Sequence, residues 1–250
     1  MITFQNKTIL ITGASGGIGA AAAKLFHGAG ANLVLTDLDT DQVEKKAVAL
    51  TQVSKAEGRI QTYALDVADA SACHTVAAAA SETFGGIDAV VNCAGIYVYK
   101  EGLLTDLTLE QWHRMIDINL TGCFNICKAT IPHLKQGSAI VLIASVAASR
   151  GSFMHSSYAA AKNGVIGLAR SLALELAPKT RTNVISPGLI NTQMAGPMVA
   201  DRGDAVKAAI PLQRFGEAVE AAGAIAFLCS DLASYISGVT LNVNGGMYID

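Results

Sequence analysis

The sequence predicts a doubly wound α/β fold, in which helices cover both faces of a parallel sheet. Short apolar runs rich in β-branched residues alternate along the chain with longer segments that have the period of a helix. These runs are too continuously apolar for strands with one face in water. With 250 residues, 51% of them hydrophobic and 15% charged, the chain can bury one large core, so we expect a single domain over residues 1–250.

Seven apolar runs are the strand candidates, and helical segments separate most of them. We expect strands at Thr8–Thr12, Asn32–Thr36, Ile60–Leu65, Ala89–Val91, Ala139–Ile143, Asn183–Ile185 and Val239–Val243. We expect helices at Ile18–Ala29, Thr40–Ala56, Asp69–Phe84, Thr108–Leu134, Ser157–Ala177 and Glu217–Cys229. Strands that alternate with helices in this way lie parallel to one another.

Two longer gaps interrupt the alternation, at Gly95–Asp106 and at Ser186–Gly216. The second gap contains three prolines and has little helical pattern except around Asp201–Ile210. Ligands of an open α/β sheet bind beyond the carboxyl ends of the strands, so loops that follow strands can line the site. We therefore expect a substrate loop or lid at about residues 186–216; a passive surface insertion is the alternative.

A glycine-rich turn, Thr12–Gly19, follows the first strand directly and opens into an alanine-rich helix. Glycine lets the backbone turn tightly and approach a pyrophosphate, whose charge the free N–H groups at the start of the helix can bind. This context predicts a dinucleotide site. The whole pattern then predicts a Rossmann-type, doubly wound, seven-stranded parallel sheet with the strand order 3-2-1-4-5-6-7.

Asp37 ends the second strand, where a carboxylate can accept hydrogen bonds from the adenosine ribose hydroxyls. No Arg or Lys stands in the glycine-rich turn or beside Asp37 to neutralise a 2′-phosphate, so NAD (NADH) is expected as the cofactor and NADP is less favoured. The alternative is that Asp37 only caps the next helix. Asp66 ends the third strand and is placed to reach the adenine, although an Asp there can also be a simple turn former.

The composition argues against several other classes of ligand and location. A net charge of −2 and the lack of a Lys/Arg run give no reason to expect nucleic acid or an anionic membrane as a partner. No stretch is long and apolar enough to span a bilayer, and the N-terminus lacks a leader pattern, so we expect a cytoplasmic protein. The five cysteines have no zinc-ligand spacing, so we expect reduced thiols and no metal site: Cys73, Cys93, Cys123, Cys127 and Cys229.

From about Lys7 to Tyr248, the sequence resembles the short-chain dehydrogenase/reductase family. The motifs that carry the resemblance are the glycine motif Thr12–Gly19, Asn92-Cys93-Ala94-Gly95, the helical Asn119, the serine Ser145, the Tyr-x-x-x-Lys pair Tyr158 and Lys162, and Pro187-Gly188. Cys93 departs from the family's second asparagine, which puts one loop hydrogen bond in doubt. The resemblance implies that Asn119, Ser145, Tyr158 and Lys162 are catalytic. It also implies that Asn119 supports Lys162 through water and that the enzyme is a homotetramer.

The cofactor-binding residues follow from the glycine motif, the strand ends and this resemblance. They are Gly13, Ser15, Gly16, Gly17, Ile18, Gly19, Asp37, Leu38, Asp66, Val67, Asn92, Ala94, Gly95, Tyr158, Lys162, Pro187, Gly188, Ile190 and Thr192. The substrate-binding residues are expected on loops at the carboxyl ends of the strands, and they are Ser145, Ala147, Phe153, His155, Tyr158 and Met194. Arg150 or His155 could bind a substrate carboxylate, although an arginine on a loop is more often solvated.

Tyr158 and Lys162 are four residues apart in one predicted helix, so both side chains project from one face. A cation about 5 Å from a phenol, at an effective dielectric constant of ~20, is worth roughly 3 kcal/mol, or about two pKa units. Tyr158 could then act as a general base or, when protonated, as a general acid, while Ser145 orients the substrate oxygen. Taken singly, a helical Tyr is more often packing and a Ser at a strand end is more often a cap.

These residues predict an NAD(H)-dependent oxidoreductase that interconverts a secondary alcohol and a ketone by hydride transfer. One alternative is a 3-oxoacyl thioester (acyl-carrier-protein) reductase, which the ending Val243–Tyr248 resembles. The expected NAD preference favours the alcohol dehydrogenase function, because reductive biosynthesis usually draws on NADPH. The basic surface around Lys128 and Lys135 is also small for docking an acidic carrier protein. A second alternative is a non-catalytic dinucleotide-sensing regulator, but such a protein should have lost Tyr158 or Lys162. Gly164 and Gly167 lie inside the predicted helix that carries Tyr158, where glycine lowers helix stability. The close approach of another helix could explain why glycine stands there.

Overall fold

The computed structural model describes residues 2–53 and 58–249. Its main sheet is parallel and seven-stranded, with the order β3-β2-β1-β4-β5-β6-β9. This order confirms the predicted fold and strand order, since the seventh strand of the sheet is labelled β9. The strands are β1 (Thr8–Thr12), β2 (Asn32–Asp37), β3 (Ile60–Ala64), β4 (Ile87–Asn92), β5 (Leu134–Ile143), β6 (Thr180–Pro187) and β9 (Thr240–Val243).

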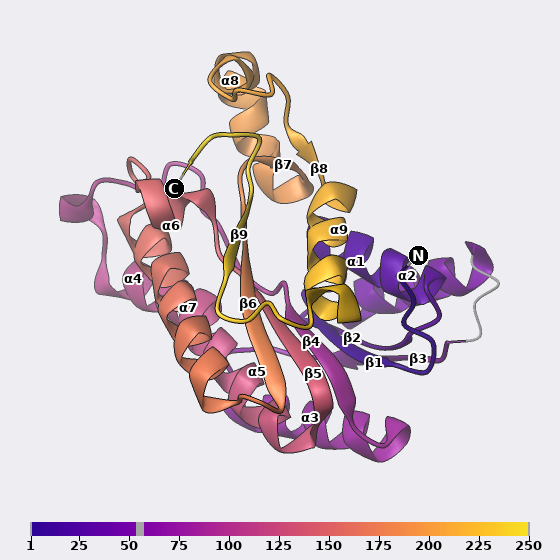
Figure 1. Ribbon diagram of the computed structural model, residues 1–250. Helices are drawn as coiled ribbons and strands as arrows, with labels where there is room; N and C mark the ends of the chain where they lie inside the picture. The colour runs from indigo at the N-terminus through magenta and orange to yellow at the C-terminus, as the bar shows by residue number, and fades with distance from the viewer. Residues whose placement is uncertain (1, 54–57, 250) are drawn as a thin grey trace.

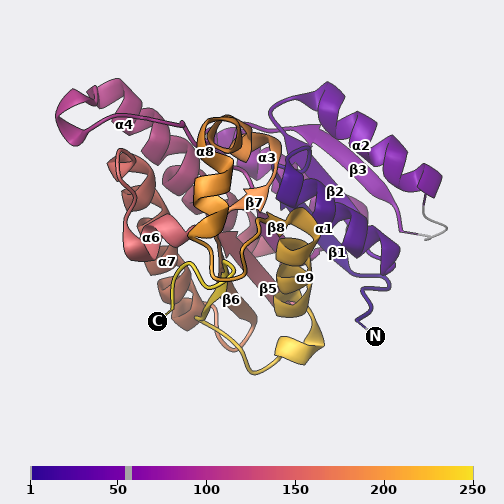
Figure 2. The same ribbon diagram turned by 90° about the horizontal axis from the view of Figure 1, so that it is seen from above.

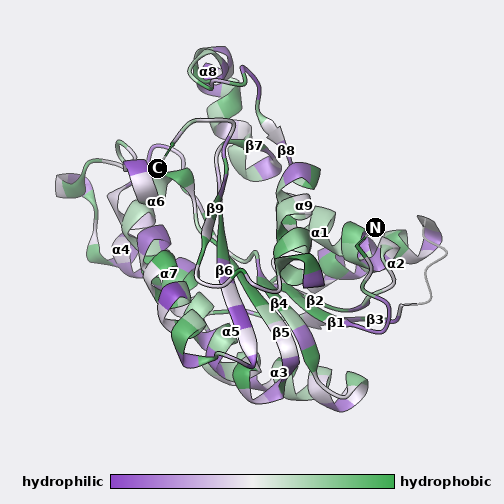
Figure 3. Cartoon of the chain, viewed as in Figure 1, coloured by the Kyte–Doolittle hydropathy of each residue, from purple (hydrophilic) through white to green (hydrophobic). Residues whose placement is uncertain are grey.

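Helices cover both faces of the sheet, as Figures 1 and 2 show. One face carries α1 (Gly17–Gly28), α2 (Thr40–Val53) and α9 (Ala218–Cys229), and the other carries α3 (Ala70–Phe84), α5 (Gly122–Thr130) and α7 (Ser156–Glu175). Successive strand residues point to opposite faces, so Leu10 of β1 packs in one core while Ile9 and Ile11 pack in the other. Figure 3 shows α9 as mostly hydrophobic, as expected of a helix packed against both the sheet and α1.

The chain after β4 departs from the single helix expected at Thr108–Leu134. It forms α4 (Leu109–Ile116), a π-helical turn (Asp117–Thr121), α5, a short 3-10 turn (Ile131–His133) and then β5, which begins at Leu134 rather than Ala139. In the π-helical turn, the amide of Asn119 donates hydrogen bonds to the carbonyls of Met115 and Ile96. The amide of Asn119 thus ties the turn to the loop after β4, beyond the carboxyl end of the sheet.

The segment after β6 contains more regular structure than the sequence predicts. It forms β7 (Ile190–Asn191), a 3-10 turn (Gln193–Ala195), α8 (Gly196–Ala208) and β8 (Gly216–Glu217). The helix expected around Asp201–Ile210 is thus present as α8, but it begins earlier, at Gly196. Pro197 is compatible with this start, because a proline in the first turn of a helix lacks only an N–H that would have no helical partner. β7 and β8 pair in parallel and join the two ends of the lid, and α8 projects beyond the sheet in Figure 1.

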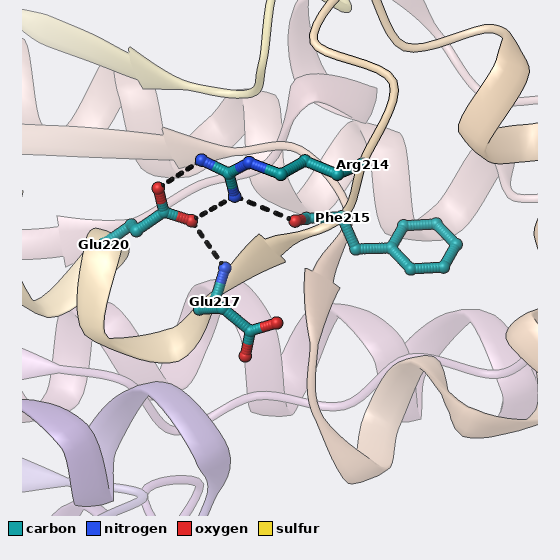
Figure 4. A network of polar contacts seen from close by, with 4 residues as sticks. All are labelled: Arg214, Phe215, Glu217 and Glu220. Carbon is teal, nitrogen blue, oxygen red and sulfur yellow. Dashed lines mark hydrogen bonds and ion pairs between the residues drawn. The ribbon is translucent and has the colours of Figure 1, made fainter.

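A network of polar contacts fixes the point where the lid returns to α9 (Figure 4). Arg214 donates to both carboxylate oxygens of Glu220, at 2.7 and 2.6 Å, and to the carbonyl of Phe215 at 3.1 Å. Glu220 also accepts a hydrogen bond from the backbone N–H of Glu217 at 2.8 Å, which caps the start of α9. The ion pair and the cap share Glu220, so the base of the lid is tied directly to a helix of the core.

Three further expectations can be compared with the described residues. The helix expected at Thr40–Ala56 is present as α2 up to Val53, and its last three residues lie outside the described part of the chain. Gly164 does allow close packing, because a Cβ there would lie 2.7 Å from Leu120 Cδ2, whereas Gly167 faces open space. Within residues 2–53 and 58–249, no helix has both the length and the hydropathy needed to span a membrane.

Candidate active site

The glycine-rich turn between β1 and α1 lies against two other loops at the carboxyl edge of the sheet. Gly13 adopts a φ of +63°, and a Cβ there would lie 2.7 Å from the backbone nitrogen of Ala94. A Cβ on Gly17 would collide with the side chain of Thr192. Helix α1 has no side-chain cap, so its first N–H groups are open to an anion. This backbone geometry fits a dinucleotide pyrophosphate.

A cavity of about 530 Å³ extends from this turn along the ends of β2, β3 and β4. It is lined by most of the residues predicted to bind the cofactor, namely Gly13, Ser15, Gly16, Gly17, Ile18, Gly19, Asp37, Leu38, Asp66, Val67, Ala94, Gly95 and Thr192. Asn92 is an exception, because its side chain is buried, accepts a hydrogen bond from the hydroxyl of Thr12 and donates to Cys123 Sγ. Its side chain therefore braces β4 against β1 rather than facing the cofactor cavity.

Asp37 faces the glycine-rich turn. One carboxylate oxygen accepts from the backbone N–H of Ser15 at 2.9 Å and from its hydroxyl at 2.5 Å. The alternative that Asp37 caps the next helix is wrong, because the carboxylate of Asp39 accepts from the N–H of Gln42 near the start of α2. Asp66 accepts from the N–H of Ala68, so it does form a turn, and it also lines the cavity. Neither Lys nor Arg is found among the described residues that line this cavity.

A second cavity of about 240 Å³ adjoins the first and brings together Asn119, Ser145, Tyr158 and Lys162. Pro187, Gly188 and Ile190, which are expected on the nicotinamide side, line it too. A Cβ on Gly95 would lie 2.7 Å from Asn119 Oδ1 and 3.3 Å from Lys162 Nζ, so both polar groups approach the backbone at Gly95. Lys162 Nζ donates to the carbonyl of Ile143 at 3.0 Å and lies 5.8 Å from the centre of the Tyr158 ring. Residues from three separate segments thus meet at one end of the sheet.

Burial, rather than Lys162, dominates the protonation of Tyr158. Burial raises the pKa of Tyr158 above its ordinary value, and a hydrogen-bonding interaction with Ser145 opposes this shift. Burial also lowers the pKa of Lys162. Both shifts arise because the charged forms lose hydration. The expectation that Lys162 lowers the pKa of Tyr158 by about two units is therefore wrong for the protein alone, in which the neutral phenol is favoured.

Of the residues expected to bind substrate, Ser145, Ala147, His155, Tyr158 and Met194 line the second cavity. Phe153 does not, because its side chain is 80% exposed. The turn before α7 directs Phe153 outward, while the carbonyl of Phe153 accepts a hydrogen bond from Nδ1 of the buried His155, at 2.7 Å. Ser145 also caps α6 (Val146–Arg150), because its hydroxyl oxygen accepts a hydrogen bond from the N–H of Ala147 at 3.2 Å. The same side chain therefore both caps a helix and lines the second cavity.

The lid contributes two residues that the sequence analysis missed, Arg202 and Val206. Both line the second cavity together with Met198, and Arg202 lies at a kink within α8, where the backbone is not helical. A regular helical spacing does not identify these residues, because the kink interrupts the helix. Tyr99, in the loop after β4, donates a hydrogen bond to Asp201 at 2.5 Å, and Lys100 forms an ion pair with the same carboxylate at 3.0 Å. These contacts hold the lid over the cavity.

The cysteines include one that borders the site. Cys93 lines both cavities, and burial raises its pKa to about 12, so its thiol stays protonated at neutral pH. All five cysteines are free thiols, and three of them, Cys73, Cys123 and Cys127, are fully buried. The expected core position therefore holds for these three, whereas Cys93 and Cys229 are only partly buried.

Comparisons with known proteins agree with this geometry. A family model described as enoyl-(acyl carrier protein) reductase matches residues 13–248. The 3-oxoacyl-[acyl-carrier-protein] reductase FabG of Escherichia coli is 38% identical over 251 aligned positions, which cover 99% of this chain and 100% of that enzyme. The chain belongs to the short-chain dehydrogenase/reductase family. Another member, FabG of Thermotoga maritima, is 34% identical over 98% of this chain and 99% of its own length.

Solved structures of the family superpose closely on this fold. A short-chain dehydrogenase/reductase from Brucella melitensis, described as glucose/ribitol dehydrogenase, has a TM-score of 0.95 and 44% identity, covering 100% of this chain and 99% of its own. Levodione reductase has a TM-score of 0.92 and 32% identity, covering 97% of this chain and 98% of its own. Family membership makes the protein an oxidoreductase with a nicotinamide cofactor. The names of these relatives span several substrates.

Proposed function

We propose that this short-chain dehydrogenase/reductase interconverts a secondary alcohol and a ketone, using NAD(H) and Tyr158 as the acid/base. The observation that carries this proposal is the convergence of Ser145, Tyr158 and Lys162 on a cavity that adjoins the glycine-rich cradle. A purely regulatory dinucleotide sensor would have no need to keep this set of side chains together. Membership of a family whose matched relatives are named as reductases also supports a catalytic function.

Each side chain has a role that follows from its position. When bound, the nicotinamide supplies or accepts the hydride. Tyr158 gives its phenol proton to the carbonyl oxygen in reduction and takes the alcohol proton in oxidation, and Ser145 holds that oxygen by a hydrogen bond. Lys162 holds the nicotinamide ribose hydroxyls. Asn119, fixed by Ile96, supports Lys162 through water.

The proposed preference for NAD rests on the charge of the cofactor cavity. Asp37 and Asp66 line it without a cation among the described lining residues. A ribose hydroxyl can donate to a carboxylate, whereas a 2′-phosphate would meet like charge there. The catalytic efficiencies (kcat/KM) with NADH and NADPH, measured by nicotinamide absorbance with one ketone, test this preference; a clear preference for NADPH would refute it.

A 3-oxoacyl thioester reductase is the second candidate, favoured by relatives named for that activity over almost the whole chain. The cavity beside Tyr158 has a volume of about 240 Å³, so the long carrier arm of a thioester substrate would have to lie outside it. Assays with an acetoacetyl thioester and with small ketones separate the two candidates. A strong preference for the thioester would replace our first proposal.

We also propose a homotetramer, in which the exposed faces of α4, α5 and α7 are covered. Apolar side chains are exposed on each of these helices, with Leu109 75%, Phe124 47% and Leu174 83% exposed. Apolar surface of this kind is typical of subunit interfaces. Sedimentation of the purified protein should give four times the mass of one chain, and replacing Leu174 with Glu should shift the mass toward smaller species. A monomeric wild type would contradict the proposal.

A further inference from the structure

The two adjoining cavities carry charges of opposite sign. The cofactor cavity has the carboxylates of Asp37 and Asp66, as described above. The substrate cavity is lined by Arg150, Lys162 and Arg202, and none of its described lining residues is an Asp or Glu. Acidic residues outnumber basic ones in the chain, with a net charge of −2, so this excess of cations is local.

Neither arginine at the substrate cavity forms an ion pair with a described residue, although the charge of Arg202 does act on the carboxylate of Asp201 and helps to lower its pKa. Arg150 ends α6 and Arg202 lies in the middle of α8. Asp201, next to Arg202, is already occupied by Tyr99 and Lys100. Arg202 instead lies 5.9 Å from the centre of the Tyr99 ring. Both guanidinium groups therefore keep their donors available at this cavity.

A buried histidine lines the same cavity and has an unused nitrogen. His155 is 3% exposed, and its ring stacks on Tyr97 with the ring centres 4.8 Å apart. Its Nδ1 lies 2.7 Å from the carbonyl of Phe153, which requires a proton on Nδ1. Nε2 is buried and has no hydrogen-bond partner among the described residues. Buried polar atoms are nearly always paired, so a polar atom of a molecule bound in this cavity would complete the hydrogen bonds of the His155 ring.

We propose that the substrate carries an anionic group, a carboxylate or a phosphate, which Arg202 and Arg150 bind while His155 contacts a neighbouring polar atom. The guanidinium group presents paired N–H donors that match both oxyanions. The cavity of about 240 Å³ has room for a small molecule. This inference rests on the proposed function, because it assigns the part of the substrate that lies beyond the carbonyl held by Ser145 and Tyr158.

Matched pairs of substrates test the charge directly. Pyruvate, acetoacetate and levulinate place a carboxylate at increasing distance from the ketone, and each is compared with its methyl ester, which removes the charge. Dihydroxyacetone phosphate is compared with dihydroxyacetone to distinguish phosphate from carboxylate. We expect kcat/KM with NADH to be about ten- to a hundredfold higher for the charged member of at least one pair. Whichever pair shows the preference identifies the oxyanion.

Variants connect that preference with the arginines. Arg202→Gln and Arg150→Gln should each reduce the ratio of kcat/KM between the charged and neutral members, and Arg202→Lys should restore part of it. Lys24→Gln removes one charge from the exposed side of α1 and should leave the ratio at the wild-type value. His155→Phe should raise KM for the charged member without reversing the preference.

The outcomes separate this inference from the proposed function. Equal turnover of charged and neutral members, abolished by Tyr158→Phe, would overturn the anionic site and leave the oxidoreductase proposal intact. If no ketone is reduced, the proposed function fails, and calorimetric titration of levulinate and of inorganic phosphate into the NADH-bound protein decides the anionic site. Binding that Arg202→Gln weakens at least tenfold would support that site. Absent or unchanged binding would overturn it.

Discussion

At the scale of single residues, Ser145 acts on the phenol that performs the proposed chemistry. Burial raises the pKa of Tyr158 and the interaction with Ser145 lowers it, so the hydroxyl partly offsets burial. Removing that hydroxyl leaves burial unopposed. The neutral phenol, which is the acid needed for ketone reduction, is then retained to higher pH.

We therefore predict that Ser145→Ala moves the alkaline limb of the pH profile for ketone reduction to higher pH. Reduction needs protonated Tyr158, so its rate falls as the pH passes the pKa, and a higher pKa moves that fall upward. The loss of one substrate hydrogen bond should also lower kcat/KM about ten- to a hundredfold. The measurement is kcat/KM against pH for the wild type and Ser145→Ala. A limb that moved to lower pH would contradict the assignment of Ser145.

Asp37 is the residue on which cofactor choice depends. We predict that Asp37→Ala lowers kcat/KM for NADH by about ten- to a hundredfold, because a charge-assisted hydrogen bond to the ribose is lost. The ratio of NADPH to NADH efficiency should rise at the same time, because the like charge is gone.

Asp37 also binds the turn through Ser15, so a control must separate the two roles. Ser15→Ala removes the 2.5 Å hydrogen bond between the hydroxyl and Asp37 and keeps the carboxylate. It should retain the preference for NADH. If Ser15→Ala and Asp37→Ala changed the cofactor ratio equally, Asp37 would act by holding the turn rather than by contacting the ribose.

At the scale of elements, the ion pair of Arg214 and Glu220 holds the returning end of the lid to α9. Arg214 lowers the pKa of Glu220 from its ordinary value of 4.5 to about 2, helped by the N–H of Glu217. A carboxyl whose pKa is lowered by folding contributes stability above its ordinary pKa and loses it as the pH falls through the lowered value. Both side chains are exposed, so the effect on global stability is small.

We predict that Arg214→Ala lowers the midpoint of thermal unfolding near neutral pH by no more than a few degrees. The difference from the wild type should disappear as the pH falls from 4.5 toward 2, because Glu220 becomes protonated in both proteins. Thermal unfolding followed by circular dichroism across this range measures the difference. Lys24→Ala, an exposed change on α1 away from the lid and from the proposed subunit interface, is the control. A difference that grew on acidification would contradict the assignment.

The elements that sequence patterns missed are those fixed by contacts between distant residues. The π-helical turn at Asp117–Thr121 lies within an ordinary helical pattern, and its Asn119 binds the loop after β4. β7 and β8 are two residues long and pair across the whole lid, so neither has a pattern of its own. The outward placement of Phe153 likewise depends on a turn rather than on sequence period. Tertiary contacts decide each of these features.

At the scale of the whole molecule, the sheet could be predicted because its signals are local and repeated. β1 is buried along its full length, and apolar runs of this kind recur along the chain between helical segments. The carboxyl ends of parallel strands meet at one edge, which predicts that Gly13, Ser145 and the first turn of the helix that carries Tyr158 converge there. The opposite charges of the two cavities could not be read in this way, because Arg150 and Arg202 come from segments that the fold alone brings together.

The central claim is that Tyr158 is the acid/base of hydride transfer in a nicotinamide-dependent oxidoreductase. The most direct measurement compares kcat/KM for ketone reduction by NADH between the wild type and Tyr158→Phe, with cofactor binding followed by the fluorescence of NADH. Positioned acid/base catalysis is worth about a hundred- to ten-thousandfold, so a loss of that size with NADH still bound is the predicted result. Turnover within a few-fold of the wild type would contradict the account.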